Sequence, residues 1–205
     1  MKKKIIAYDL SMNSKSLALI AIFSAMAIVL NVIKIPTIYW PAMFYMVSDI
    51  PVLVAFLLFG FKIGFLVEAI HILGQEIFFP VGPAGVVFYP MGIFIHLFMF
   101  SGIYFANKFL NRRVEEVDVK KKTVFFTGFA AALRGALMPL IDYGLLYYFL
   151  LPLVLGHTIP LAYTLALVPS FVVYNVTSTL YAVPLAHLIA RKAGKFLRIK
   201  TSIQL

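Results

Sequence analysis

Four short clusters of lysine and arginine separate long apolar stretches of this chain. They lie at residues 2–15, at Lys62, at residues 108–122 and at residues 191–200, and together they hold 16 of the 18 basic residues. Basic loops stay on the cytoplasmic side of a membrane, so loops that alternate between basic and charge-poor fix the topology. The pattern predicts a polytopic membrane protein with both termini in the cytoplasm.

The composition excludes an ordinary soluble domain. Hydrophobic residues make up 62% of the 205 residues and charged residues only 13%, whereas soluble domains carry about 25% charged residues. The net charge of +10 accompanies no nucleic-acid-binding motif, so we expect the basic loops to face anionic lipid headgroups and not nucleic acid. The absence of cysteine excludes disulfides and thiolate metal sites.

The apolar segments predict an all-α bundle of six transmembrane helices, since one span needs about 20 residues. One membrane domain, residues 16–190, is expected between a cytoplasmic lead, residues 1–15, and a basic cytoplasmic tail, residues 191–205. Asp49 is a suitable amino-terminal cap for the second span, and Pro139 predicts a break in the fifth. The expected spans cover residues 16–33, 48–60, 64–79, 86–109, 123–151 and 161–189.

The loop at residues 35–47 follows the first span and is expected on the outer side. It contains Tyr39, the only tryptophan, Trp40, and also Met43 and Phe44. Aromatic rings at this level often serve as interface anchors. The other interpretation is a lid, in which stiff aromatic and adaptable methionine side chains cover a flat ligand. The sequence leaves both interpretations open.

Glu68, Arg134 and Asp142 are ionisable residues at membrane depth, where a charge is costly and marks a functional candidate. Glu68 and Arg134 are expected near mid-membrane, and we expect them to pair, whereas Asp142 lies closer to the outer face. Such a pair either bridges helices structurally or contacts a substrate.

No motif in the chain predicts catalysis or metal binding. Glu68 and His71 share a helical face, and His96 and His187 also lie in spans, but no H-E-x-x-H or similar pattern joins them. We therefore expect no metal site and no catalytic residue. The chain also lacks a G-x-x-x-x-G-K-[ST] loop, so it does not hydrolyse ATP in that manner.

Two further features point to recognition. In the sixth span, the Asn175 amide beside Tyr174 can both donate to and accept from the edge of a heterocycle, although an asparagine in a span also serves as a bond between helices. In the first span, Ala21 and Ala25 have the small-xxx-small spacing that permits close approach of another helix.

These features together resemble the substrate-binding S components of energy-coupling factor (ECF) vitamin transporters. The resemblance covers essentially the whole chain: six spans, cytoplasmic ends, the aromatic outer loop, the alanine pair and the Ser-Asp-Ile-Pro run at residues 48–51. Residues 48–53, 59–60, 64–68 and 174–175 look most like the riboflavin-specific members.

The resemblance implies a high-affinity binding protein in the plasma membrane, with a pocket near the outer face capped by the loop at residues 35–47. It implies a membrane T component, on which Ala21 and Ala25 dock, and two cytoplasmic ATPases. Asn175 would pair with the pyrimidine edge of a flavin. The chain departs from the riboflavin pattern at two places. It has Ser178 where those members often have a lysine, and His71 and Ile72 where they often have a basic and a polar residue.

We therefore expect a vitamin-importer subunit that binds riboflavin as its transported ligand, with no covalently bound cofactor. The expected ligand contacts are Tyr39, Trp40, Met43, Phe44, Asp49, Glu68, Arg134 and Asn175. Three alternatives remain: an S component for another vitamin, an autonomous proton-coupled transporter with a relay of Glu68, Arg134 and Asp142, and an intramembrane enzyme that uses Glu68 and a histidine.

Overall fold

The computed structural model is mainly helical. It describes residues 14–37, 44–80, 85–113, 118–145, 147–148, 152, 156 and 160–196, without the side chains of residues 86–88 and 112–113. Within these ranges the elements are α1 (Ser14–Leu30), β1 (Lys34–Pro36), β2 (Phe44–Met46), α2 (Asp49–Phe59), α3 (Phe61–Phe78), α4 (Gly85–Arg113), α5 (Val119–Leu145) and α7 (Leu161–Phe196).

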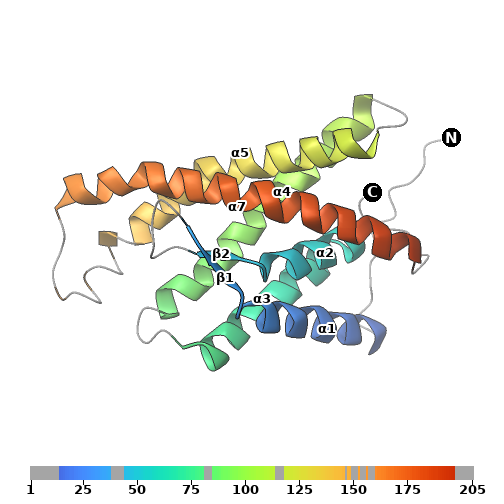
Figure 1. Cartoon of the computed structure of the whole chain (residues 1–205), viewed down its shortest axis with the longest axis horizontal. Coiled ribbons are helices and arrows are strands. Elements are labelled where there is room, and N and C mark those ends of the chain that lie inside the picture. Colours follow the sequence, from blue (N-terminus) through green and yellow to red (C-terminus); the bar gives the residue numbers. More distant parts are fainter. Residues whose placement is uncertain are drawn as a thin grey trace.

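The helices form two groups that α4 joins (Figure 1). Helices α5 and α7 lie side by side, α1 and α3 pack together, and α2 contacts both α7 and α3. The start of α1, the α2–α3 joint, the end of α4, the start of α5 and the end of α7 all lie toward the right of Figure 1. The described parts of the basic clusters lie in these segments and so gather at one end of the bundle.

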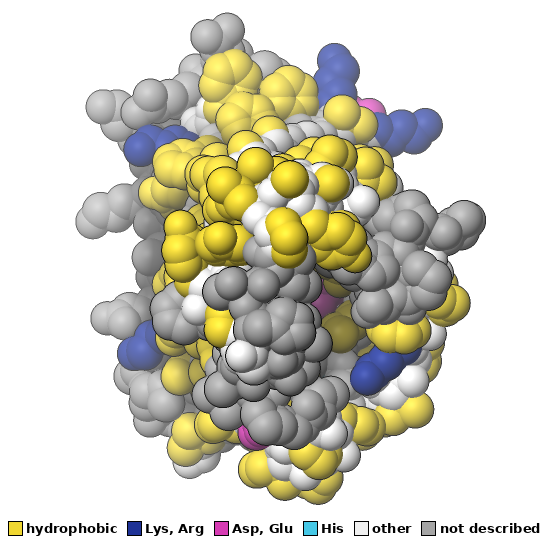
Figure 2. All heavy atoms as spheres, turned by 90° about the vertical axis from the view of Figure 1, so that its left-hand side faces the viewer, with side chains coloured by type: hydrophobic (Ala, Val, Ile, Leu, Met, Phe, Trp, Pro, Cys, Tyr) yellow, Lys and Arg dark blue, Asp and Glu magenta, His cyan; other side chains and the backbone are white. Residues whose placement is uncertain are grey.

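Within the described ranges, three helices are long and apolar enough to cross a membrane: residues Tyr89–Asn111 of α4, all of α5 and all of α7. The apolar helices α1 and α2 are shorter, and α3 carries Lys62, Glu68 and Glu76 within its 18 residues. At the end of the molecule opposite the basic clusters, hydrophobic side chains cover most of the described surface (Figure 2). The count of six spans and the cytoplasmic termini stay predictions.

Two expectations about the elements were wrong, the turn after α2 and the break in α5. The expected turn at residues 60–64 is reduced to Gly60, whose φ of 92° suits glycine, and α3 begins at the next residue. Helix α5 continues through Pro139 to Leu145 without a break. Helix α7 runs past the expected sixth span to Phe196, and the cytoplasmic tail from residue 191 stays a prediction. The expected all-α class agrees with a mainly helical chain, to which the short antiparallel pair of β1 and β2 after α1 is a small addition.

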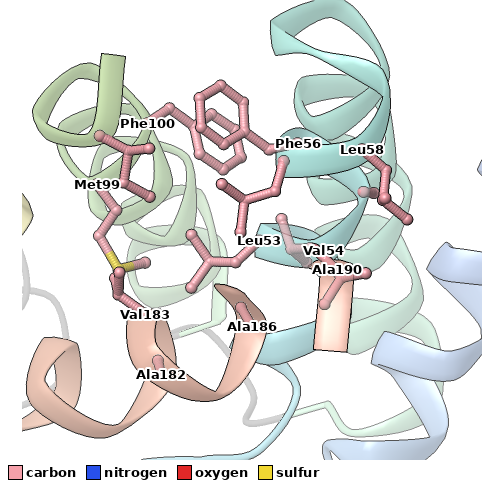
Figure 3. Packing of buried hydrophobic residues seen from close by; sticks show 14 of the residues in the cluster. Leu53, Val54, Phe56, Leu58, Met99, Phe100, Ala182, Val183, Ala186 and Ala190 are labelled. Carbon is pink, nitrogen blue, oxygen red and sulfur yellow. The ribbon is translucent and has the colours of Figure 1, made fainter. Parts of the chain in front are cut away.

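Helix α2 forms the centre of the core because every residue in it except Ile50 is buried. Figure 3 shows Leu53 and Phe56 of α2 directed toward Met99 and Phe100 of α4, and Val54 of α2 beside Ala190 of α7. The rings of Phe56 and Phe100 stack with centroids 4.2 Å apart. The alanines of α7 recur every four residues, so their small side chains present a smooth strip against which α2 packs closely.

Helices α4 and α5 meet at Gly102. A Cβ atom placed there would lie 2.5 Å from the Ala130 Cα and 2.6 Å from its nitrogen, both backbone atoms that cannot move aside. Glycine at this position therefore sets how closely the two helices approach.

Candidate functional site

Nine buried polar side chains form a continuous row across the bundle, which we name the polar row. In order of contact its members are Asn31, Gln75, His71, Glu68, His96, Asp49, Arg134, Asn175 and Asp142. Residues from α2, α3, α4, α5 and α7, together with Asn31 just beyond α1, contribute to it. Buried polar groups need partners, and here they partner one another.

In the first part of the row, from Asn31 to Glu68, the donor and acceptor of each hydrogen bond can be assigned. The Gln75 amide nitrogen donates to the Asn31 Oδ1 at 3.1 Å and lies 2.9 Å from the His71 Nε2. Because an amide nitrogen only donates, His71 accepts at Nε2 and carries its hydrogen at Nδ1. That Nδ1 donates to the Glu68 Oε2 at 3.0 Å. This part therefore ends on a carboxylate held by a neutral imidazole.

His96 continues the row from α4. Its Nδ1 lies 3.0 Å from the Gly92 carbonyl oxygen and 3.1 Å from the Glu68 Oε1, and since a carbonyl only accepts, Nδ1 carries the hydrogen. A Cβ at position 92 would lie 2.6 Å from that Glu68 oxygen. Glycine at this position therefore leaves room for the Glu68 carboxylate. The His96 Nε2 lies 3.9 Å from the Asp49 Oδ1 and has no hydrogen-bond partner among the described residues.

Arg134 anchors the second part. Its Nε donates to the Asn175 Oδ1 at 2.9 Å, its Nη1 lies 3.7 Å from the Asp49 Oδ2, and the same Nη1 contacts the Met99 sulfur at 3.5 Å. The Asn175 nitrogen donates to the Asp142 Oδ2 and to the Phe171 carbonyl, both at 2.9 Å. Both amide hydrogens of Asn175 are thus occupied within the protein.

The expected pair between Glu68 and Arg134 was wrong. Glu68 is paired with His71 and His96, and the carboxylate near Arg134 belongs to Asp49. The reason is the packing order, because α4 and the start of α2 place His96 and Asp49 between the two residues. Both nevertheless belong to one row, and a buried charge with partners on each side is far less costly than an isolated one.

The β1–β2 hairpin is fastened to α7 beside this row. The Tyr174 hydroxyl donates to the Phe44 carbonyl at 2.9 Å, and the Tyr181 hydroxyl donates to the Met46 carbonyl at 2.9 Å. Tyr45 stacks on Tyr174 with centroids 5.8 Å apart, and its hydroxyl lies 2.7 Å from the Thr177 Oγ1. The Arg134 guanidinium lies 5.9 Å from the centroid of the Tyr174 ring, so one tyrosine contacts both hairpin and row.

The structure brings together the expected contacts Asp49, Glu68, Arg134 and Asn175. Phe44 lies in β2, half-buried. The other lid residues, Tyr39, Trp40 and Met43, lie outside the described residues.

Sequence reasoning did not assign Asn31, Gln75 or His96 to this site. The available signal was a polar side chain inside an apolar segment, but spacing along one helix does not show which other helix it meets. Among the described residues, no three histidine, aspartate or glutamate side chains are arranged to hold a metal ion.

The expected docking residues lie on α1. Ala21 and Ala25 are exposed, whereas Ser24 faces inward and its hydroxyl donates to the Val67 carbonyl at 3.3 Å. The small-residue face of α1 is therefore directed away from the bundle.

Comparisons with known proteins agree on the class. A family model described as "ECF transporter, substrate-specific component" matches residues 15–193. A solved structure described as "Structure and mechanism of the S component of a bacterial ECF transporter" shares the fold, with a TM-score of 0.59 and 22% sequence identity over 90% of this chain and 98% of that one. No curated protein matches the chain. On the extent of the family match, the chain belongs to the substrate-specific components of ECF transporters.

Proposed function

We propose that this chain binds riboflavin and delivers it to an ATP-driven importer in the cell membrane. As a substrate-specific component it is a membrane-embedded binding subunit and not an enzyme. The observation that carries the choice of ligand is the aromatic hairpin fastened beside the polar row. A flavin combines a flat ring with a hydrogen-bonding edge, and ligand sites commonly join apolar walls to a few placed polar groups.

The contacts of Asn175 define how the ring edge is recognised. Its Oδ1 accepts one hydrogen bond, from Arg134, and an amide oxygen has two lone pairs. Its two hydrogens go to Asp142 and to the Phe171 carbonyl. The pyrimidine edge of a flavin therefore donates to the free lone pair of Oδ1 and, to receive a hydrogen, displaces Asp142 from Asn175.

The energy for transport comes from other subunits in this proposal, because the sequence has no phosphate-binding loop of the Walker type. A membrane T component and two cytoplasmic ATPases supply it. The exposed alanines of α1, Ala21 and Ala25, let a helix of the T component approach closely.

Protein purified as its riboflavin complex is expected to be yellow, and titration with riboflavin is expected to quench flavin fluorescence, because aromatic side chains stack on the bound ring. Trp40→Ala is expected to weaken binding about tenfold, the equivalent of roughly 1.4 kcal/mol. Lys62→Ala, an exposed change at the distant α2–α3 joint, serves as the control and is expected to leave the affinity unchanged. A colourless preparation without quenching contradicts the ligand, and competition by a different vitamin then favours the other S-component assignment.

Reconstituted alone in liposomes, the chain is expected to bind riboflavin without accumulating it. Accumulation that a protonophore abolishes would instead identify a proton-coupled transporter, whose relay would run through Glu68, Arg134 and Asp142. Uptake measured with and without the T component and the ATPases separates the two outcomes.

A further inference from the structure

The His96 imidazole is fixed on one side and unpartnered on the other. The side chain is 2% exposed, and its Nδ1 is held by the Gly92 carbonyl and by Glu68. Its Nε2 has no hydrogen-bond partner within the described part of the chain. A buried polar atom left without a partner is destabilising, and a ligand group placed there removes that penalty.

Asp49 faces the same position. The nearest cationic or imidazole nitrogens to its two oxygens are the His96 Nε2 at 3.9 Å and the Arg134 Nη1 at 3.7 Å. Both separations exceed a hydrogen bond, for which N–H···O distances are about 2.7–3.2 Å. The preceding Ser48 hydroxyl is likewise buried and without a partner in the residues described. Polar atoms with unused hydrogen-bonding capacity therefore gather at the start of α2.

We propose that His96 and Asp49 bind the hydroxyl groups of a polyol chain on the ligand, an inference that rests on the proposed function because riboflavin carries such a chain. Adjacent hydroxyls suit the pair in either charge state of the imidazole. Against an Nε2 that carries hydrogen, one hydroxyl accepts from it and donates to the carboxylate. Against a bare Nε2, one hydroxyl donates to the nitrogen and its neighbour to Asp49. A ligand carbonyl group would be unfavourable here, because a carbonyl oxygen and the Asp49 carboxylate both accept hydrogen bonds and neither donates.

The order of the polar row gives the ligand a direction. Arg134 and Asp49 stand between Asn175 and His96 in the order of contact, so the two recognition points do not touch the same ligand atom. The ring edge lies at Asn175, and the polyol chain extends along Arg134 toward His96. Glu68 acts as a positioning residue, because its carboxylate keeps the Nδ1 side of His96 occupied and directs Nε2 toward Asp49.

The test compares riboflavin with lumiflavin, which has the same ring but a methyl group in place of the polyol chain. The full-length protein is titrated with each by fluorescence quenching, as wild type and as His96→Phe, His96→Asn and His96→Gln. Glutamine places a polar atom near the former Nε2, whereas asparagine reaches only the former Nδ1. We expect His96→Phe and His96→Asn to weaken riboflavin binding roughly 10- to 100-fold, lumiflavin binding to change less than about twofold, and His96→Gln to retain most of the riboflavin affinity.

Each outcome decides the inference. Equal loss for both flavins, or loss in His96→Gln as large as in His96→Asn, assigns His96 a structural role and overturns the polyol contact. Unchanged riboflavin affinity in all three variants overturns it as well. Lumiflavin binding shows that a variant is folded. If the wild type binds neither flavin, the proposed ligand is wrong and this contact falls with it, a result distinct from any effect confined to His96.

Discussion

Replacing Arg134 with methionine is expected to lower the free energy of unfolding by about 3–5 kcal/mol, the range found when one partner of a buried pair is removed. The side chain is 1% exposed and lies where α5 meets α2, α4 and α7. Without it, the Asp49 carboxylate loses its nearest cation and the Asn175 oxygen loses its donor. Flavin binding is expected to disappear, because Arg134 connects both recognition points. Equilibrium unfolding in mild detergent, followed by circular dichroism, measures the first effect.

Two control variants separate charge from geometry. Arg134→Lys keeps a cation near Asp49 but lacks the Nε hydrogen that reaches Asn175, so about half of the loss is expected. Lys62→Met removes a basic charge from an exposed position, where changes are usually within about 0.5 kcal/mol. If Arg134→Met proves as stable as Lys62→Met, the polar row does not hold the bundle together.

Gly102→Ala is expected to destabilise the protein by about 1–3 kcal/mol, the usual effect of overpacking. The added Cβ meets the backbone of Ala130, so α4 and α5 must separate. Gly128→Ala is the matched control, because it lies within α5 and its Cβ would meet no atom within 4 Å.

Both substitutions gain the same helix propensity, about 1 kcal/mol, and only the first introduces a clash. The difference between the two variants therefore reports the α4–α5 approach. Measured by the same unfolding experiment, equal stability of the two variants would show that these helices are not in the close contact described.

Patterns along single segments were enough to predict most of the helices. The basic clusters and apolar stretches located α1 to α5 and α7 to within several residues, since these signals act locally. Pro139 was misjudged because the helix continues around it, as neighbouring helices and local adjustments allow within a membrane. Helix α7 extends beyond the expected end of the sixth span, because basic residues mark the membrane boundary and not the end of a helix.

The site was only partly accessible from sequence. Glu68, Arg134, Asp49 and Asn175 stood out as polar groups at membrane depth or in matching motifs. Their partners did not, because the link between Glu68 and His96 depends on how α3 meets α4. The incorrect pairing of Glu68 with Arg134 has the same origin, since depth in the membrane says nothing about which helices are neighbours.

The attachment of the hairpin to α7 has a consequence for ligand specificity. The hydroxyls of Tyr174 and Tyr181 donate to the main-chain oxygens of Phe44 and Met46 and not to their side chains. Every amino acid supplies such an oxygen, so the side chains at these two positions can be exchanged without releasing the strand. The side chains of the hairpin can accordingly be redesigned for a different ligand while its main-chain hydrogen bonds to α7 are kept.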